Sequence, residues 1–255
     1  MNRGVAQFGR APSLGGGCPR FKSLYPDWYI TNTNLTMKIF LDTAEVSDIT
    51  RRFATGLIDG VTTNPSLIRK SGKDPLDVYR ELANIGVTDI SMEVVGDVGQ
   101  MYQDAVELHE QFPEVSTIKL PCTVDGLLVC KKLSDMQIRT NVTLIFSAAQ
   151  AILAAKAGAT YVSPFIGRYD DNSISGLELV RSITSIYQVQ GVQTKVLAAS
   201  LRDVYKVSRA FYNGAHIVTM PTKVFDKMYE HVLTDKGLDI FQKDYEETIK
   251  ALGNG

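Results

Sequence analysis

From Lys38 onward, the chain alternates short β-rich runs with longer amphipathic segments. The β-rich runs are KIFLD (38–42), GVTTN (60–64), DISMEVV (89–95), STIKL (116–120), RTNVTLIF (139–146), TYVSPFI (160–166), TKVLAAS (194–200) and HIVTM (216–220). Because a helix-like segment separates each run from the next, consecutive strands are expected to run parallel. Eight such units in 255 residues predict a single (β/α)8 TIM barrel, an α/β fold of about 250 residues.

The segments between the runs have helical spacing. In 98–112, for example, apolar residues recur at intervals of three or four positions, as on one face of a helix. Similar patterns predict helices over 124–136, 147–157, 177–189 and 202–213, with an additional C-terminal helix over 239–252. Glycines at 86, 158, 191 and 214 follow helices and precede strands, where a helix-ending glycine is expected.

The alternative architecture is a doubly wound open sheet. Such a sheet usually carries a glycine-rich nucleotide loop after its first strand. Here the first strand continues into LDTAE, and the chain contains neither a GxGxxG nor a Walker sequence. The barrel is therefore the preferred prediction.

Residues 1–36 lack helical or strand periodicity and carry four basic residues against one acid, Asp27. A transit peptide is one interpretation, although no amphipathic helix is visible, and a secretory signal would need a continuous apolar region. The run VAQFGRAPSLGGGCPRFKS also resembles translation across a transfer-RNA gene. We expect Met37 to be the true start, with residues 1–36 an artefactual or disordered extension and residues 37–255 the barrel domain.

The composition argues against several classes of protein. The net charge of −1 gives no general attraction to nucleic acid or to an acidic membrane, and no apolar run approaches the ~20 residues of a membrane helix. Three cysteines without metal-like spacing favour a reducing compartment. The three histidines are far apart. We therefore expect a cytoplasmic protein without a metal or other cofactor.

Polar residues lie near the C-terminal ends of the predicted strands, on the face that alternation turns inward. In STIKL, Ile118 and Leu120 share the face suited to helices, which leaves Thr117 and Lys119 inside. The same parity places the following residues inside: Asp42, Thr62, Asn64, Ser91, Glu93, Asn141, Thr143, Ser163, Phe165 and Ser200. Barrel enzymes build their active sites at this end of the strands.

Each of these residues also has an ordinary structural explanation. A lysine in a strand is usually exposed, Asp42 could cap the next helix, and Asn64-Pro could mark a turn. Glu93 could be a paired acid in the barrel interior. The shared face and depth of these residues favour a common site, because burying unpaired charges costs several kcal/mol.

Such a site can perform imine chemistry. The amine of Lys119 can attack a ketone, and the resulting iminium accepts electrons when a neighbouring C–C bond breaks. Asp42 suits the proton transfer at the far hydroxyl, and Glu93 with Thr143 and a water suits the proton transfers of imine formation. The remaining inward side chains are assigned to substrate binding: Thr62, Asn64, Asn141, Ser163 and Phe165.

Two arginines follow late strands. Arg168 comes after the sixth strand, and Arg202 follows Ser200 after the seventh. A phosphate site commonly lies near the last strands of a barrel, and arginine binds phosphate through paired hydrogen bonds. We assign these three residues to phosphate binding. The alternative is that both arginines are solvated charges at helix starts.

The residues together resemble the small transaldolase and fructose-6-phosphate aldolase family. The matching stretches are FLDTAE, DGVTTNPSLI, TIKLPCTVDGL, TNVTLIFSAAQA, YVSPFIGRYDD, KVLAASLR and IVTMP. The resemblance implies a class I Schiff-base mechanism with Lys119 as nucleophile and Asp42 as acid and base. It also implies phosphate contacts at Arg168, Ser200 and Arg202, and ring-shaped decamers that form through the C-terminal helix.

Two activities occur within this family. The aldolases that release free dihydroxyacetone carry Gln and Tyr where this chain has Glu93 and Phe165, so the chain is similar to the transaldolases. We therefore expect transfer of a dihydroxyacetone unit from sedoheptulose 7-phosphate or fructose 6-phosphate to glyceraldehyde 3-phosphate or erythrose 4-phosphate, in the pentose phosphate pathway. The alternatives are the free aldolase and a catalytically inactive barrel that binds a ligand.

Overall fold

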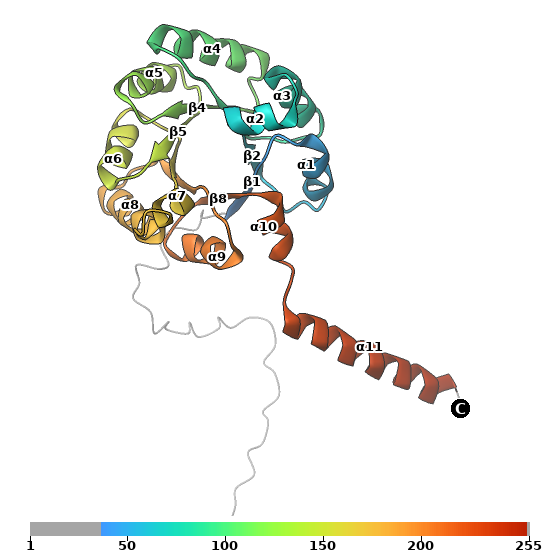
Figure 1. The fold of residues 1–255 in the computed structure, drawn as a ribbon. Coiled ribbons are helices and arrows are strands. Elements are labelled where there is room, and N and C mark those ends of the chain that lie inside the picture. Colours follow the sequence, from blue (N-terminus) through green and yellow to red (C-terminus); the bar gives the residue numbers. More distant parts are fainter. Residues whose placement is uncertain (1–36, 254–255) are drawn as a thin grey trace, which may run out of the picture. The chain divides into compact units, whose positions relative to one another are not determined.

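The computed structural model describes residues 37–253, so the prediction for residues 1–36 lies outside the described part of the chain. Eight parallel strands close into a barrel in the order β1 to β8, and helices surround them (Figure 1). The strands are β1 (Lys38–Asp42), β2 (Gly60–Thr62), β3 (Ile90–Glu93), β4 (Ser116–Pro121), β5 (Thr140–Ile145), β6 (Tyr161–Pro164), β7 (Lys195–Ala198) and β8 (Ile217–Met220). The predicted (β/α)8 barrel is confirmed.

The helices agree with the periodicity where they are long. They are α1 (Val46–Phe53), α2 (Pro65–Ser71), α3 (Pro75–Asn84), α4 (Val98–Gln111), α5 (Val124–Asp135), α6 (Ala148–Lys156), α7 (Ile166–Asp170), α8 (Gly176–Gln190), α9 (Val204–Tyr212), α10 (Thr222–Lys227) and α11 (Val232–Gly253). The prediction named no range for α1, α2, α3, α7 or α10. Of these, α7 and α10 are too short to display a 3.6-residue period. Among residues 37–253, no helix combines the length and the apolar character that a membrane span needs.

Alternation along the strands separates two packed layers. Ile118 and Leu120 of β4 are fully buried in the large core between barrel and helices, as strand parity predicted. The barrel interior has its own smaller apolar cluster, in which Phe40 of β1 meets Tyr161 of β6 edge to face, with ring centroids 6.5 Å apart. The polar side chains of the pocket therefore lie on the inner face of the same strands.

The N-terminal end of the barrel is closed by a polar cluster around Asp89. Its carboxylate accepts hydrogen bonds from Thr117 Oγ1 (2.8 Å) and from Tyr161 Oη (2.7 Å). Arg139 approaches the same carboxylate at 3.5 Å. Because these three groups compensate the buried charge of Asp89, this cluster has a structural role. The active sites of barrel enzymes lie at the opposite, C-terminal end of the strands.

Strand β5 departs from simple alternation. Its register against β6 shifts between Val142 and Ile145, and Leu144 adopts a positive φ of 58°. Ile145, rather than Leu144, is buried in the outer core. Strict alternation from Val142 would turn Leu144 outward, and this expectation is wrong because a bulge inserts one residue into the period. Thr143 stands immediately before this irregularity.

Candidate active site

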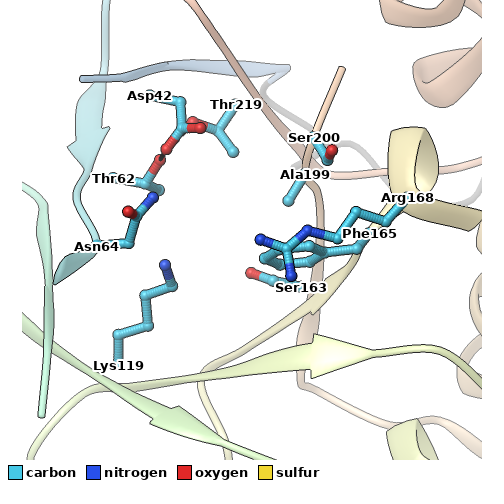
Figure 2. A pocket seen from close by; sticks show the side chains of 10 residues that line it. All are labelled: Asp42, Thr62, Asn64, Lys119, Ser163, Phe165, Arg168, Ala199, Ser200 and Thr219. Carbon is cyan, nitrogen blue, oxygen red and sulfur yellow. Dashed lines mark hydrogen bonds between the residues drawn. The ribbon is translucent and has the colours of Figure 1, made fainter. Parts of the chain in front are cut away.

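A cavity of about 100 Å³ opens among the C-terminal ends of the strands. Its lining consists of Asp42, Thr62, Asn64, Lys119, Ser163, Phe165, Arg168, Ala199, Ser200 and Thr219 (Figure 2). Strand parity had placed most of these residues inside the barrel. The structure thus brings together, in one small pocket, residues that lie far apart in the sequence.

Lys119 lies at the centre of the site, on β4. Its side chain is only 5% exposed, and its Nζ lies 2.8 Å from Glu93 Oε2. The same Nζ donates a hydrogen bond to the carbonyl oxygen of Thr63 at 2.9 Å. Glu93 and Lys119 are direct partners in the parallel register of β3 and β4, which explains their closeness. The pair gives a buried amine an adjacent carboxylate that can exchange protons with it.

Asp42 ends β1 on the other side of the cavity (Figure 2). Burial raises the pKa of its carboxyl group, while the charge of Lys119 and the hydrogen bond from Thr62 act in the opposite direction. Thr62 Oγ1 donates to Asp42 Oδ1 at 2.8 Å. The helix-cap alternative for Asp42 is wrong, because Glu45 occupies the N-cap of α1. A buried carboxyl group with a raised pKa is suited to accept and return a proton.

Sequence reasoning missed Thr219. Its Oγ1 lies 2.7 Å from Thr62 Oγ1, and its side chain lines the cavity beside Asp42. The signal was present, since Val218 and Met220 are buried in the outer core and alternation turns Thr219 inward. Because threonine is uncharged, its inward position alone does not indicate a role in chemistry.

A second polar group lies on β5 and β6. Ser163 Oγ donates to Asn141 Oδ1 at 2.7 Å, and Asn141 Nδ2 donates to Ser91 Oγ at 3.1 Å. These two bonds fix the orientation of the Asn141 amide. Asn141 itself does not line the cavity, so it supports Ser163, which does.

Two further predicted residues have distinct surroundings. Asn64 lines the cavity and also caps α2, because its Oδ1 accepts a hydrogen bond from the backbone N–H of Leu67 at 3.0 Å. Asn64 therefore serves as helix start and pocket residue at once. The buried Thr143 Oγ1 has no hydrogen-bond partner among the described residues, which leaves it free for a water or a substrate.

Arg168 reaches into the cavity from α7, directly after β6 (Figure 2). Its guanidinium lies over the ring of Phe165, 5.0 Å from the centroid, within the range of a cation–π contact. Phe165 in turn packs against Phe146, with ring centroids 5.9 Å apart. No carboxylate pairs with Arg168 within residues 37–253, so its charge is available to an anion.

Arg202 has a different environment. Its Nη1 and Nη2 bind both carboxylate oxygens of Asp171 at 2.5 and 2.6 Å, and it does not line the cavity. Ser200 does line it, with a positive φ of 60°. A Cβ at Gly167 would lie 2.3 Å from Ser200 O and 2.8 Å from Arg202 Nε, so only glycine permits this close approach. Of the two arginines that were predicted to bind phosphate, only Arg168 lines the cavity.

A parallel barrel with a lysine–carboxylate pair at the C-terminal ends of its strands has a nucleophile and an acid–base group where barrel enzymes build their active sites. The family model described as transaldolase/fructose-6-phosphate aldolase matches residues 39–254. The chain belongs to this family.

Named relatives agree with this assignment. The chain is 50% identical over 217 residues to a probable transaldolase of Erythrobacter litoralis, a match that covers 85% of this chain and 100% of the relative. It is 48% identical over the same length to a probable transaldolase of Caulobacter vibrioides. A probable transaldolase of Bacillus cereus is 46% identical over 213 residues, which cover 83% of this chain and 99% of the relative. The chain is thus a transaldolase-type enzyme.

Proposed function

We propose that this enzyme transfers a dihydroxyacetone unit through a Schiff base on Lys119. The donor is sedoheptulose 7-phosphate or fructose 6-phosphate, and the acceptor is glyceraldehyde 3-phosphate or erythrose 4-phosphate, as in the pentose phosphate pathway. The observation that carries the proposal is the Lys119–Glu93 pair at 2.8 Å. Lys119 lines one cavity with Asp42 and Arg168, while Glu93 lies outside the lining.

Imine formation uses the acid beside the lysine. Glu93 accepts a proton from the Lys119 ammonium, and the neutral amine attacks C2 of the ketose to form a carbinolamine. Glu93 returns its proton to the departing hydroxyl, and water leaves as the iminium forms. The hydroxyl of Thr143, which has no hydrogen-bond partner among residues 37–253, suits the water that carries these protons.

Carbon–carbon cleavage uses Asp42. Its carboxylate removes the proton from the C4 hydroxyl, the C3–C4 electron pair moves toward the iminium, and an aldose phosphate leaves. The remaining enamine adds to the aldehyde carbon of the acceptor, and Asp42 returns the proton to the new hydroxyl. Water then hydrolyses the iminium and frees Lys119. The raised pKa of Asp42 favours its role as a proton acceptor.

A coupled transfer assay tests this function. The enzyme is incubated with fructose 6-phosphate in the presence and absence of erythrose 4-phosphate, and sedoheptulose 7-phosphate, glyceraldehyde 3-phosphate and free dihydroxyacetone are measured. We expect product formation to depend on the acceptor. Free dihydroxyacetone as the main product would instead identify the enzyme as a fructose-6-phosphate aldolase.

Phe165 is expected to suppress that release. Its ring lines the cavity without a hydroxyl, whereas a tyrosine there could hold a water beside the enamine. We predict that Phe165→Tyr raises the yield of free dihydroxyacetone from fructose 6-phosphate severalfold and lowers transfer. Phe146→Tyr is the matched control, because Phe146 packs on Phe165 outside the cavity lining. An unchanged product ratio in Phe165→Tyr would show that this residue does not decide between transfer and release of dihydroxyacetone.

The two arginines are expected to contribute unequally to phosphate binding. Arg168→Gln should raise the KM for fructose 6-phosphate by roughly 10–100-fold, the value of a charged hydrogen bond. Arg202→Gln should have a smaller effect, because Asp171 already occupies its guanidinium. Steady-state kinetics with phosphorylated and unphosphorylated donors measures both. Equal losses in the two variants, or equal losses with an unphosphorylated donor, would contradict the assignment.

We further propose a homo-oligomer, which the family resemblance suggests is a decamer. Helix α11 exposes an apolar stripe at intervals of three or four residues, formed by Leu238, Phe241, Tyr245, Ile249 and Leu252. Such a surface usually marks a protein contact, and a second copy of the chain is the occupant we propose. Light scattering should show a smaller mass for Phe241→Glu than for the control Gln242→Glu, whereas equal masses would exclude the stripe as the interface.

A further inference from the structure

Two threonine hydroxyls form successive hydrogen bonds that lead to the carboxylate of Asp42. Thr62 on β2 donates to Asp42 Oδ1 at 2.8 Å, and Thr219 on β8 lies 2.7 Å from Thr62, oxygen to oxygen. Strands β2 and β8 both pair with β1, so the closure of the barrel brings the two threonines together over the inner face of β1. Figure 2 shows the three side chains gathered at one side of the cavity.

The number of protons fixes the direction of these bonds. A hydroxyl donates one hydrogen bond and accepts up to two. When Asp42 is ionised, the single proton of Thr62 goes to the carboxylate. Thr219 must then be the donor in its contact with Thr62. Each hydroxyl in such a chain polarises the next, so donation by Thr219 strengthens the bond that Thr62 makes to Asp42.

The direction of both hydrogen bonds can also reverse. If the protonated Asp42 donates from Oδ1 to Thr62, the proton of Thr62 turns toward Thr219, which accepts it. Both threonine side chains are buried, with 2% of each residue exposed. Little water can therefore reach either hydroxyl, and in the reversed arrangement Thr219 is the acceptor for the proton of Thr62.

We propose that Thr219 is a positioning residue for the proton transfers of Asp42, acting through Thr62 as a reversible two-hydroxyl relay. The inference rests on the proposed role of Asp42 in carbon–carbon cleavage. It adds a residue whose hydroxyl is bonded to Thr62 rather than to the carboxylate itself. In this role Thr219 favours the ionised form of Asp42 and keeps its carboxylate in one orientation.

The other groups around Asp42 are known and stay unchanged in a Thr219 variant. Lys119 from β4 and Arg168 from α7 favour the ionised form, while Glu93 from β3 opposes it. Replacing Thr219 with valine removes one hydroxyl and retains the side-chain shape. Any change in the titration of Asp42 can then be assigned to the relay, because the three charges remain in place.

The test compares Thr219→Val and Thr219→Ser with the wild-type enzyme. For Thr219→Val we expect kcat to fall about 5–10-fold and the acidic limb of the pH profile of kcat/KM to move up by roughly half to one pH unit. The limb moves up because a weaker bond from Thr62 leaves Asp42 protonated to higher pH. KM should change by less than about twofold, and Thr219→Ser should restore both kcat and the limb.

Two readouts separate this inference from the proposed function. Borohydride trapping should give the same amount of lysine adduct in wild type and Thr219→Val, since imine formation uses Lys119 and Glu93. Absence of an adduct in the wild type would overturn the proposed function, whereas a wild-type pH profile and kcat in an adduct-forming Thr219→Val would overturn the relay alone.

Thr117→Val is the matched control for stability. Thr117 also donates to a buried aspartate, Asp89, at 2.8 Å, but at the opposite end of the barrel. It should lower the unfolding temperature without moving the acidic limb. If Thr117→Val moved the limb as far as Thr219→Val does, the effect would be a general consequence of lost stability and the relay would be wrong.

Discussion

Lys119→Arg is expected to be inactive while remaining folded. Arginine keeps a positive charge next to Glu93, but its guanidinium is always protonated and cannot attack a ketone. Transfer between sugar phosphates should fall by more than about 10⁴-fold, as when other covalent catalysts lose their nucleophile. The measurement is the coupled transfer assay, together with mass spectrometry of the protein after borohydride reduction in the presence of fructose 6-phosphate.

A second variant separates nucleophile from charge. Lys119→Met removes both, and it leaves the largely buried carboxylate of Glu93, 15% exposed, without its partner. Breaking such a pair costs about 3–5 kcal/mol, so Lys119→Met should be much less stable than Lys119→Arg in urea unfolding. The double variant Lys119→Met/Glu93→Gln should recover most of the loss, because no unpaired charge remains.

The outcomes of the lysine experiment are distinct. A reduced adduct that persists in both Lys119 variants would show that another lysine carries the substrate. Activity within tenfold of wild type in Lys119→Arg would exclude a Schiff base at this position altogether. Lys131, which pairs with Asp135 on the exposed face of α5, supplies the control Lys131→Met, for which full activity and a normal adduct are expected.

Asp42→Asn is expected to block a later step than the lysine variants do. An amide cannot take the proton from the C4 hydroxyl, so kcat for transfer should fall by about 10²–10⁴-fold. The imine should still form, since Lys119 and Glu93 are intact, and borohydride should trap a normal amount of the donor adduct. Loss of the adduct in a folded Asp42→Asn protein would move Asp42 into the chemistry of imine formation.

The same substitution should stabilise the protein at neutral pH. Burial raises the pKa of Asp42 above its ordinary value of 3.8, so the folded protein binds a proton that the unfolded chain has already released. Over the interval from that ordinary value up to the folded pKa, the free energy of unfolding therefore falls as pH rises. Above this interval the loss is complete, and the ionised carboxylate remains as a cost to folding.

Urea unfolding across pH tests the linkage. Asn cannot ionise, so Asp42→Asn should lack this part of the pH dependence and be more stable than wild type at neutral pH. A variant Asp42→Asn that is more stable but inactive would show that the wild-type carboxyl group lowers stability and is required for catalysis. If Asp42→Asn is less stable than wild type at neutral pH, the hydrogen bond from Thr62 outweighs the burial of the charge.

Strand alternation explains how far the candidate site could be predicted. Each inward position follows from its own strand, so Lys119 and Glu93 could be placed from four or five residues of local sequence. Their adjacency also follows, because β3 and β4 are consecutive parallel strands in register. The prediction fails on β5, where the bulge at Leu144 breaks the period and carries no clear sequence signal.

Which residues contribute to the function was harder to predict than where each residue lies in the barrel. Arg168 and Arg202 have similar sequence settings after consecutive strands, yet Asp171 holds Arg202 while Arg168 lies over Phe165 and faces the cavity. The pairing depends on the path of the loops after β6 and β7, which hydrophobic periodicity does not describe. Thr219 was missed for a related reason, since its importance lies in a neighbour rather than in its own chemistry.

The order of the strands, the inward face of each and the chemistry available at their ends follow from the amino-acid sequence, because a two-residue period and a side chain are local properties. Which of those side chains meet depends on the folded barrel. Closure of the barrel pairs β8 with β1. It thereby brings Thr219, on the last strand, to Thr62 and Asp42 on the first two strands. Such contacts depend on the geometry of the closed ring, which no local pattern contains.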